Sequence, residues 1–369
     1  MTRLFFAALI SAVASTAHAD FTLTILHTND FHARFEPISR FDSTCAEEDN
    51  LAGECFGGSA RLATAIAAAR DASVNPVLLD GGDQFQGTLF YSYYKGQLAA
   101  EMMNRLGYDA MTVGNHEFDD GPEVLAGFID AVDFPVLMSN ADVHGDVHLA
   151  DKIEKSTVIE RGGQRIGLIG ITPEDTHLTS SPGAHVHFTD AIPAVQAEVD
   201  RMTAEGINKI ILLSHTGYLE DLDIAKAVTG VDVIVGGHTN TYLANDDPDA
   251  SGPYPTMVGD TAVVQAYAYG KFLGQLDVVF DEAGKIKTAT GGPALMDAAV
   301  SEDSGVKARI AEAAVPLDEI RQRVVAQALE PINGDRAQCR FRECQMGSLV
   351  ADAMLDRTSR KGSATRPAS

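Results

Sequence analysis

Positive charge is scarce in this sequence. Its 369 residues include 28 Lys and Arg against 52 Asp and Glu, which gives a formal net charge of −24 at pH 7. A chain this acidic is a poor general partner for nucleic acid, because the phosphate backbone selects basic surfaces. A small phosphorylated substrate is not excluded, because a bound metal ion can supply positive charge locally.

Long apolar stretches are missing except at the N-terminus. Residues 4–14 are almost wholly apolar, follow Arg3 and precede Ala17-His18-Ala19, the small-x-small pattern of a signal-peptidase site. The stretch is too short for a membrane anchor, and no second run of about 18 apolar residues follows. The cleavage site has no cysteine that could carry a lipid. We therefore predict a signal peptide at residues 1–19 and a soluble exported chain, periplasmic or extracellular, without a membrane anchor.

Cysteine is also rare, and its four copies form two local pairs, Cys45 with Cys55 and Cys339 with Cys344. In an oxidising compartment these pairs predict two disulfides. Each would close a short loop and stabilise the fold by about 2–3 kcal/mol in the chain-entropy model. The alternative is one zinc site with four thiolates, but the pairs are far apart and lack the C-x2-C spacing.

What the sequence does contain is a repeated alternation of apolar strands with helical stretches such as 59–70, 97–106 and 192–205. This alternation is typical of the α/β class. Residues 261–280 follow another pattern, two strands around a Gly-Lys turn, and we expect an antiparallel hairpin there. The change of pattern favours a four-layer αββα sandwich over one open sheet.

The C-terminal part of the sequence changes character. Residues 20–300 carry the alternation of strands and helices and form the predicted main domain. A charged, alanine-rich stretch predicts a connector helix within 301–330. Residues 331–369 then predict the truncated start of a second α/β domain, with a helix at 346–355 and a basic, disordered tail that cannot build a core.

Five predicted strands each end in residues that can bind a metal ion. In chain order, these residues are Asp30 and His32, then Asp83, then Asn115, then His215, and finally His238 and Asn240. One match alone would be weak, and a Gly-Asp turn would explain Asp83 equally well. Five matches are a strong signal, because α/β proteins build their sites at the C-terminal ends of strands. Asp30 and His32 are two residues apart, so an extended backbone would point both side chains to the same side.

The predicted ligands indicate two metal ions. They are histidines, carboxylates and amides with no thiolate, which excludes a structural cysteine site and suits Zn²⁺, Mn²⁺, Fe²⁺ or Co²⁺. Seven ligands exceed the four that a single tetrahedral ion uses, and a carboxylate such as Asp83 can bridge two ions. Two ions about 3.5–4 Å apart stabilise an in-line displacement at phosphorus and provide hydroxide near neutral pH. We expect Zn²⁺, with Mn²⁺ as the alternative.

Two residues beside the third strand end have the chemistry for proton transfer. His116 adjoins Asn115 and therefore enters the same cavity, where a cationic imidazole would stabilise the phosphoryl oxygens or protonate the leaving group. Asp119, three residues on, can hold the tautomer of this imidazole or favour its charged form. The alternative for Asp119 is a helix-cap acid, because Pro122 follows closely.

Together, these motifs resemble the calcineurin-like metallophosphatases, and among them the 5′-nucleotidase family. The resemblance covers about residues 21–355. It rests on the segments His27–His32, Gly82–Gln84, Gly114–Asp119, Ser214–His215 and Gly237–Asn240. Residues 265–271 and 339–344 are similar to the ecto-5′-nucleotidase branch.

The resemblance implies roles for particular residues. One metal ion would be held by Asp30, His32, Asp83 and Asn240, and the other by Asp83, Asn115, His215 and His238. Asn115 would also touch the substrate phosphate, and His116 with Asp119 would form the catalytic dyad. Arg340 would bind phosphate from a second domain, of which residues 331–369 are the start, whereas residues 20–300 would be the metallophosphatase domain.

The implied function is an exported phosphomonoesterase that hydrolyses nucleoside 5′-monophosphates, with a small nucleotide as its partner and no specified oligomeric state. One alternative keeps the metal centre and changes the substrate to a UDP-sugar, a 2′,3′-cyclic nucleotide or a dinucleotide. Another is a metal-binding remnant without activity. It arises because the family's second domain, with an aromatic clamp for the base, should continue well past Leu355.

Overall fold

The computed structural model describes residues 20–364, so the predicted signal peptide at residues 1–19 lies outside the described residues. The chain divides into two compact units, the first ending at Leu317 and the second beginning at Asp318. Helix α9 (Ser304–Gln322) runs across this division. The domain boundaries at residues 300 and 330 stay a prediction.

The first unit contains two six-stranded sheets. Their strand orders are β14-β13-β1-β2-β3-β4 and β11-β12-β10-β9-β7-β6. The first sheet consists of β1 (Phe21–Thr28), β2 (Pro76–Asp80), β3 (Ala110–Thr112), β4 (Val136–Leu137), β13 (Phe272–Phe280) and β14 (Ile286–Leu295). The second consists of β6 (Ser156–Arg161), β7 (Gln164–Ile171), β9 (Ile210–Ser214), β10 (Val233–Val235), β11 (Thr256–Val258) and β12 (Thr261–Val264). A small separate sheet pairs β5 (Ala141–Asp142) with β8 (His187–Phe188).

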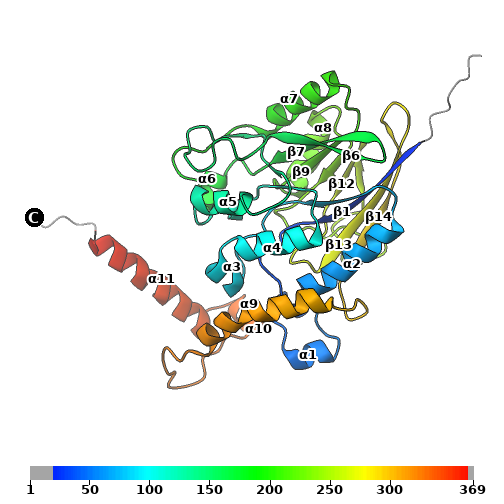
Figure 1. Ribbon diagram of the computed structural model, residues 1–369. Helices are drawn as coiled ribbons and strands as arrows, with labels where there is room; N and C mark the ends of the chain where they lie inside the picture. Colours follow the sequence, from blue (N-terminus) through cyan, green and yellow to red (C-terminus); the bar gives the residue numbers. More distant parts are fainter. Residues whose placement is uncertain (1–19, 365–369) are drawn as a thin grey trace, which may run out of the picture. The chain divides into compact units, whose positions relative to one another are not determined.

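Helices cover the outer face of each sheet (Figure 1). The first sheet carries α2 (Ser59–Ala72), α4 (Gln97–Leu106), α5 (Pro122–Ile129) and the first part of α9. The second carries α7 (Ala191–Ala204) and α8 (Tyr218–Ala227). The shorter helices are α1 (Glu47–Leu51), α3 (Leu89–Tyr94), η1 (His116–Phe118) and α6 (Thr176–Thr179).

The central strands are apolar on both faces, and this builds the layers. In β9, Ile211 and Leu213 belong to the core between the sheets, whereas Leu212 packs among the residues of α7 and α8. A strand that is buried on both sides shows no alternation with polar residues. The arrangement is the four-layer αββα sandwich that the sequence predicts, so the predicted fold class is confirmed.

Strand direction brings the predicted site together. Strands β1, β2, β3 and β4 are parallel neighbours in one sheet, and β7, β9, β10 and β12 are parallel neighbours in the other. The loops that follow β1, β2 and β3 therefore leave the first sheet at one edge, and those after β9 and β10 leave the second sheet together. All seven predicted metal ligands stand in these five loops.

The hairpin predicted at residues 261–280 is wrong. Strand β12 pairs with β10 and β11 in the second sheet, while β13 pairs with β1 and β14 in the first. The residues between them cross from one sheet to the other, and Tyr267 and Tyr269 break the extended backbone with φ of 61° and 62°. Two apolar stretches joined by a Gly-Lys pair have the pattern of a hairpin, and this pattern led to the wrong prediction. The antiparallel neighbour of β12 is β11, and β13 is antiparallel to β14 and β1.

Both predicted disulfides are present, Cys45–Cys55 in the first unit and Cys339–Cys344 in the second, with Cα–Cα distances of 6.0 and 5.2 Å. The second unit contains α10 (Arg336–Cys339) and α11 (Gln345–Ala364). Helix α11 continues past Leu355 to Ala364, where the sequence suggested a disordered tail. Residues 365–369 lie outside the described residues.

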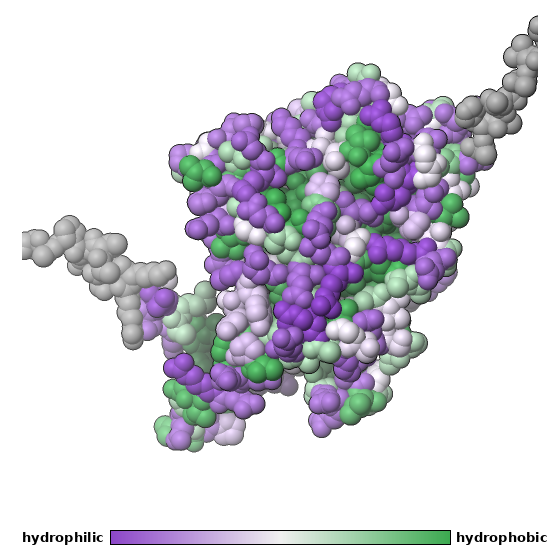
Figure 2. Space-filling model, in the orientation of Figure 1, coloured by the Kyte–Doolittle hydropathy of each residue, from purple (hydrophilic) through white to green (hydrophobic). Residues whose placement is uncertain are grey.

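Hydrophilic side chains predominate on the face of the first unit shown in Figure 2, and hydrophobic ones occur there in scattered spots. This exterior agrees with the formal net charge of −24. Within residues 20–364, no helix has both the length and the hydropathy needed to cross a membrane.

Candidate metal centre

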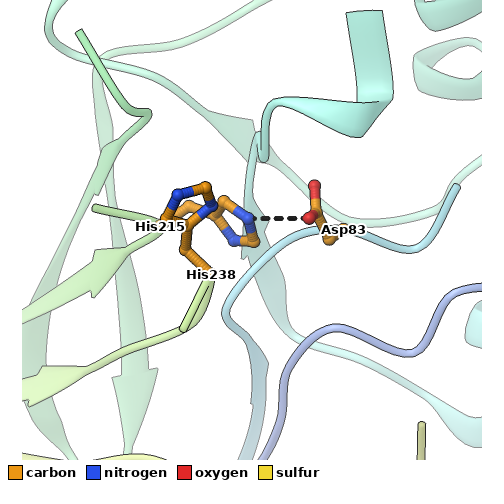
Figure 3. A group of neighbouring side chains, drawn as sticks. All are labelled: Asp83, His215 and His238. Carbon is orange, nitrogen blue, oxygen red and sulfur yellow. Dashed lines mark ion pairs between the residues drawn. The ribbon is translucent and has the colours of Figure 1, made fainter. Parts of the chain in front are cut away.

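The loops at the strand ends bring carboxylate and imidazole groups into two overlapping clusters. One contains Asp30, His32 and Asp83, and the other contains Asp83, His215 and His238, with ligand atoms within 4.8 Å of one another in each. Asp83 belongs to both, and its Oδ2 lies 3.7 Å from His32 Nε2 and 3.0 Å from His215 Nε2. Figure 3 shows Asp83 facing His215, with His238 beside it. The two clusters contain the carboxylates and imidazoles of the two sets that the resemblance implies, whereas the assignment of all seven residues as metal ligands stays a prediction.

Two of these histidines have the orientation of metal ligands. His32 Nδ1 lies 2.9 Å from the carbonyl oxygen of Phe85, and His215 Nδ1 lies 2.5 Å from that of Gly81. A carbonyl only accepts hydrogen bonds, so each Nδ1 carries a proton, which leaves Nε2 as the ring nitrogen available to a metal ion. Metal-binding histidines are typically fixed in this way through their other ring nitrogen.

Two candidate ligand atoms are buried without a hydrogen-bond partner. Among the described residues, this holds for Asn115 Oδ1 and Asn240 Oδ1. Burying a polar atom without a partner costs about 1–3 kcal/mol, so native structures seldom do it without a reason. Two such atoms, contributed by two of the five loops, fit a site whose oxygens bind cations.

Without a cation, this cluster needs a proton. Burial acts to lower the pKa of His215, but the carboxylates of Asp83 and Asp30 outweigh it and raise that pKa to about 10. Burial also acts to raise the pKa of Asp83, yet the charge on His215 holds that pKa below its usual range. At Asp30 burial dominates and raises the pKa to about 7. Divalent cations would displace the proton and neutralise the carboxylates, so the electrostatics also fit a metal site.

Five of the seven predicted ligands have a left-handed backbone. The φ angles of Asp30, His32, Asp83, His238 and Asn240 are 50°, 51°, 60°, 71° and 51°. Such conformations cost a non-glycine residue on the order of 1–3 kcal/mol each, and they collect at functional sites.

This backbone corrects one step of the sequence interpretation. Strand β1 ends at Thr28, so Asp30 and His32 do not share one side of an extended strand. The left-handed turn brings both side chains to Asp83 instead. The residue types were the reliable signal, whereas the strand alternation was not.

The predicted dyad is formed and has a third member. Asp119 Oδ2 lies 2.6 Å from His116 Nδ1, and Ser180 Oγ donates to Asp119 Oδ1 at 2.6 Å. The hydrogen bond to Asp119 is the main reason why the pKa of His116 rises to about 9. Asp119 does not cap the start of α5, because the N-cap there is Gly121 and the Asp119 carboxylate faces His116 and Ser180. Ser180 carried no signal in the sequence.

His116 also belongs spatially to the metal cluster. Its backbone N–H donates to Asp83 Oδ1 at 2.9 Å, and its ring lies 5.2 Å from the ring of His32 between centroids. The dyad therefore stands beside the predicted bridging carboxylate. Arg340 lies in the second unit with an exposed side chain, and its role in binding phosphate stays a prediction.

A family model for the calcineurin-like phosphoesterases matches residues 23–242. This range covers more than half of the chain and contains all seven predicted ligands. The chain belongs to this family. Its sequence is 40% identical to a 5′-nucleotidase precursor from Thermus thermophilus, whose crystal structure superimposes with a TM-score of 0.81 over 93% of this chain and 68% of that one. Within the family, the chain therefore belongs with the 5′-nucleotidases.

Two further relatives mark the range of the similarity. Snake venom 5′-nucleotidase from Naja atra is 43% identical over 91% of this chain and 65% of its own length. The NAD nucleotidase of Haemophilus influenzae is 27% identical over 84% of this chain and 62% of its own, with a TM-score of 0.75. The chain thus spans less than two thirds of the length of each of these two relatives.

Proposed function

We propose that the chain is an exported, metal-dependent phosphomonoesterase that hydrolyses nucleoside 5′-monophosphates to nucleoside and phosphate. The observation that carries the proposal is the convergence of two carboxylates and three imidazoles in two overlapping clusters that share Asp83. The similarity to proteins named 5′-nucleotidases supports the substrate class. Similarity to a venom protein and the predicted signal peptide support export to the periplasm or the exterior.

Seven residues of the first unit would hold two divalent cations, with Zn²⁺ expected and Mn²⁺ as the alternative. One ion would lie among Asp30, His32, Asp83 and Asn240, and the other among Asp83, Asn115, His215 and His238. When bound, such ions supply a nucleophile at neutral pH and neutralise charge on the phosphoryl group.

The other residues of the centre would handle charge and protons. Asn115 has an amide nitrogen that can donate to a phosphoryl oxygen, and its buried Oδ1 has no hydrogen-bond partner and would bind a cation. His116, kept cationic by Asp119, can stabilise the phosphoryl oxygens or protonate the departing 5′-oxygen of the nucleoside. Ser180 fixes the second oxygen of Asp119, so that the dyad keeps one orientation.

A substrate panel tests this proposal. Phosphate release would be measured for AMP, UDP-glucose, 2′,3′-cyclic AMP, NAD and p-nitrophenyl phosphate, with the metal-loaded protein and with D83N. We expect AMP to be preferred and D83N to lose turnover of every substrate. AMP hydrolysis that is unchanged in D83N would refute the proposal. Hydrolysis of p-nitrophenyl phosphate alone would indicate a metal-binding chain without nucleotide activity.

A second candidate, hydrolysis of a dinucleotide phosphoanhydride, is favoured by one feature of the first unit. A cavity of about 530 Å³ adjoins His238, with Ile192 and Ile224 among its apolar walls and Glu220 and Asp175 among its acidic groups. Carboxylates there would disfavour a phosphate but accept a neutral or cationic ring. NAD turned over faster than AMP in the same panel would select this candidate, which the similarity to an NAD nucleotidase also supports.

A further inference from the structure

Glu117 is a fully buried carboxylate directly behind the predicted metal ligands. Its Oε2 accepts the backbone N–H groups of Asp83 at 2.9 Å and Gly114 at 2.7 Å. Its Oε1 accepts those of Gln84 at 2.8 Å and Phe85 at 3.2 Å. Four backbone donors from two strand-end loops thus converge on one side chain, although this side chain does not face the reaction.

The loop that Glu117 binds, residues 82–85, is itself the support for another loop, residues 30–33. The carbonyl groups of loop 82–85 point away from Glu117 and accept N–H groups of loop 30–33. Asp30 N–H donates to the carbonyl of Gly82 at 2.9 Å. His32 N–H donates to that of Asp83 at 3.0 Å, and Ala33 N–H to that of Gln84 at 3.1 Å. A displacement of loop 82–85 would therefore move the ligands Asp30 and His32 along with Asp83.

We propose that Glu117 is a positioning residue for both metal ions. Glu117 accepts hydrogen bonds from N–H groups of loop 82–85, and the carbonyls of this loop accept hydrogen bonds from loop 30–33. One carboxylate therefore fixes the positions of three predicted ligands, Asp30, His32 and Asp83. The proposal rests on the proposed two-metal centre and adds to it a residue that touches neither the metal nor the substrate.

The donors specify a carboxylate rather than any polar side chain. Three of the four donors, Asp83, Gln84 and Phe85, are consecutive residues, and Asp83 has φ of 60°, so the turn directs their N–H groups toward one point. Each Glu117 oxygen accepts two of the four groups. An amide of the same size would place its NH₂ group against two N–H donors, whichever way it is turned, because an NH₂ group cannot accept a hydrogen bond.

The central test compares Glu117→Gln with two controls. Asp232→Asn changes a largely buried carboxylate that also accepts a backbone N–H, from Ile210 at 2.7 Å, but that stands at the opposite end of strand β10. Val278→Ala weakens the core between the sheets without touching the loops. Metal-stripped proteins would be titrated with Zn²⁺ and with Mn²⁺ in a calorimeter, and their melting temperatures would be measured with and without metal.

We expect Glu117→Gln to weaken both binding steps by about 10- to 100-fold, the usual effect of losing a group that orients metal ligands. Its melting temperature should rise less on metal addition than that of the wild type. Val278→Ala should melt at a lower temperature while binding both ions as tightly as the wild type, and Asp232→Asn should also bind both normally. A Glu117→Gln protein that is less stable but binds both ions with unchanged affinity would overturn the proposal.

Two further outcomes are distinguishable. If the wild type binds no metal, the proposed function fails, and the result does not depend on Glu117. If Glu117→Gln does not accumulate as folded protein, Glu117→Asp decides the question, because it keeps the charge but is too short to reach all four donors. Weakened binding of both ions by folded Glu117→Asp would support the proposal, and unchanged binding would contradict it.

Discussion

The substitution Asp119→Asn tests how the dyad controls the proton on His116. The carboxylate of Asp119 lies 2.6 Å from His116 Nδ1 and is the main cause that raises the pKa of His116 to about 9, from an ordinary value of 6.5. An amide keeps the volume but loses the charge. The pKa should therefore return toward its ordinary value, by about 2 pH units.

The pH dependence follows from this shift. If protonated His116 is required, activity falls as the pH rises through its pKa, and the variant should lose activity at lower pH than the wild type. For a pKa that moves from about 9 to about 7, the protonated fraction at pH 8 falls from about nine tenths to about one tenth, while at pH 6 it hardly changes. Bound cations would repel the protonated imidazole and lower the pKa of His116 in both the wild type and Asp119→Asn. We therefore predict the difference in pH between the two activity profiles rather than the position of either one.

The assay is the pH profile of kcat/KM for AMP with metal-saturated protein. The neighbouring substitution Asp120→Asn is the matched control, because the Asp120 carboxylate bonds Tyr91 and Lys95 and not His116. Its profile should stay in place. An alkaline limb that is not displaced in Asp119→Asn, with an equal loss of activity at pH 6 and pH 8, would refute the assigned role of the dyad.

Three further substitutions test separate parts of the account. Ser180→Ala removes the hydrogen bond to Asp119 and should lower kcat for AMP by about 2- to 10-fold. The loss should be smaller for p-nitrophenyl phosphate, because its leaving group needs no proton. Equal losses for both substrates would contradict the assigned role of Ser180. Burial raises the pKa of Asp232 to about 7, so the free energy of unfolding should fall as the pH rises from about 4 to 7, and urea titrations should show a weaker fall for Asp232→Asn. An equally steep fall would rule this group out as its source. Replacing Cys45 and Cys55 by serine should lower the free energy of unfolding by about 2–3 kcal/mol, and an unchanged midpoint in denaturant would contradict the contribution of the disulfide.

The sequence was sufficient for the layers of the fold and for the types of residue that gather at the strand ends. Apolar strands that end in Asp, His or Asn identify both the sheets and their functional edge, because few other contexts place such residues directly after a buried strand. The predicted grouping of the ligands around Asp83 agrees with the distances in the structure. Local pairing of the cysteines was equally readable, since short separations leave few other partners.

Features that depend on the path of the chain were not readable. The crossing between the sheets at residues 265–271 has the apolar pattern of a hairpin, and only the backbone conformations of Tyr267 and Tyr269 tell the two apart. Ser180 reaches Asp119 across 61 residues of sequence. The sequence assigns Glu117 no chemical role. Its burial becomes apparent only when four backbone donors are seen around it.

The most direct measurement of the central claim is the number of metal ions bound per chain. Metal analysis of purified, dialysed protein should find about two divalent ions per wild-type chain, in accordance with a two-metal phosphoesterase site. Asp83→Asn should bind far less, because this carboxylate belongs to both ligand clusters. A wild-type chain that retains no metal, or an Asp83→Asn chain that retains both ions, would contradict the account.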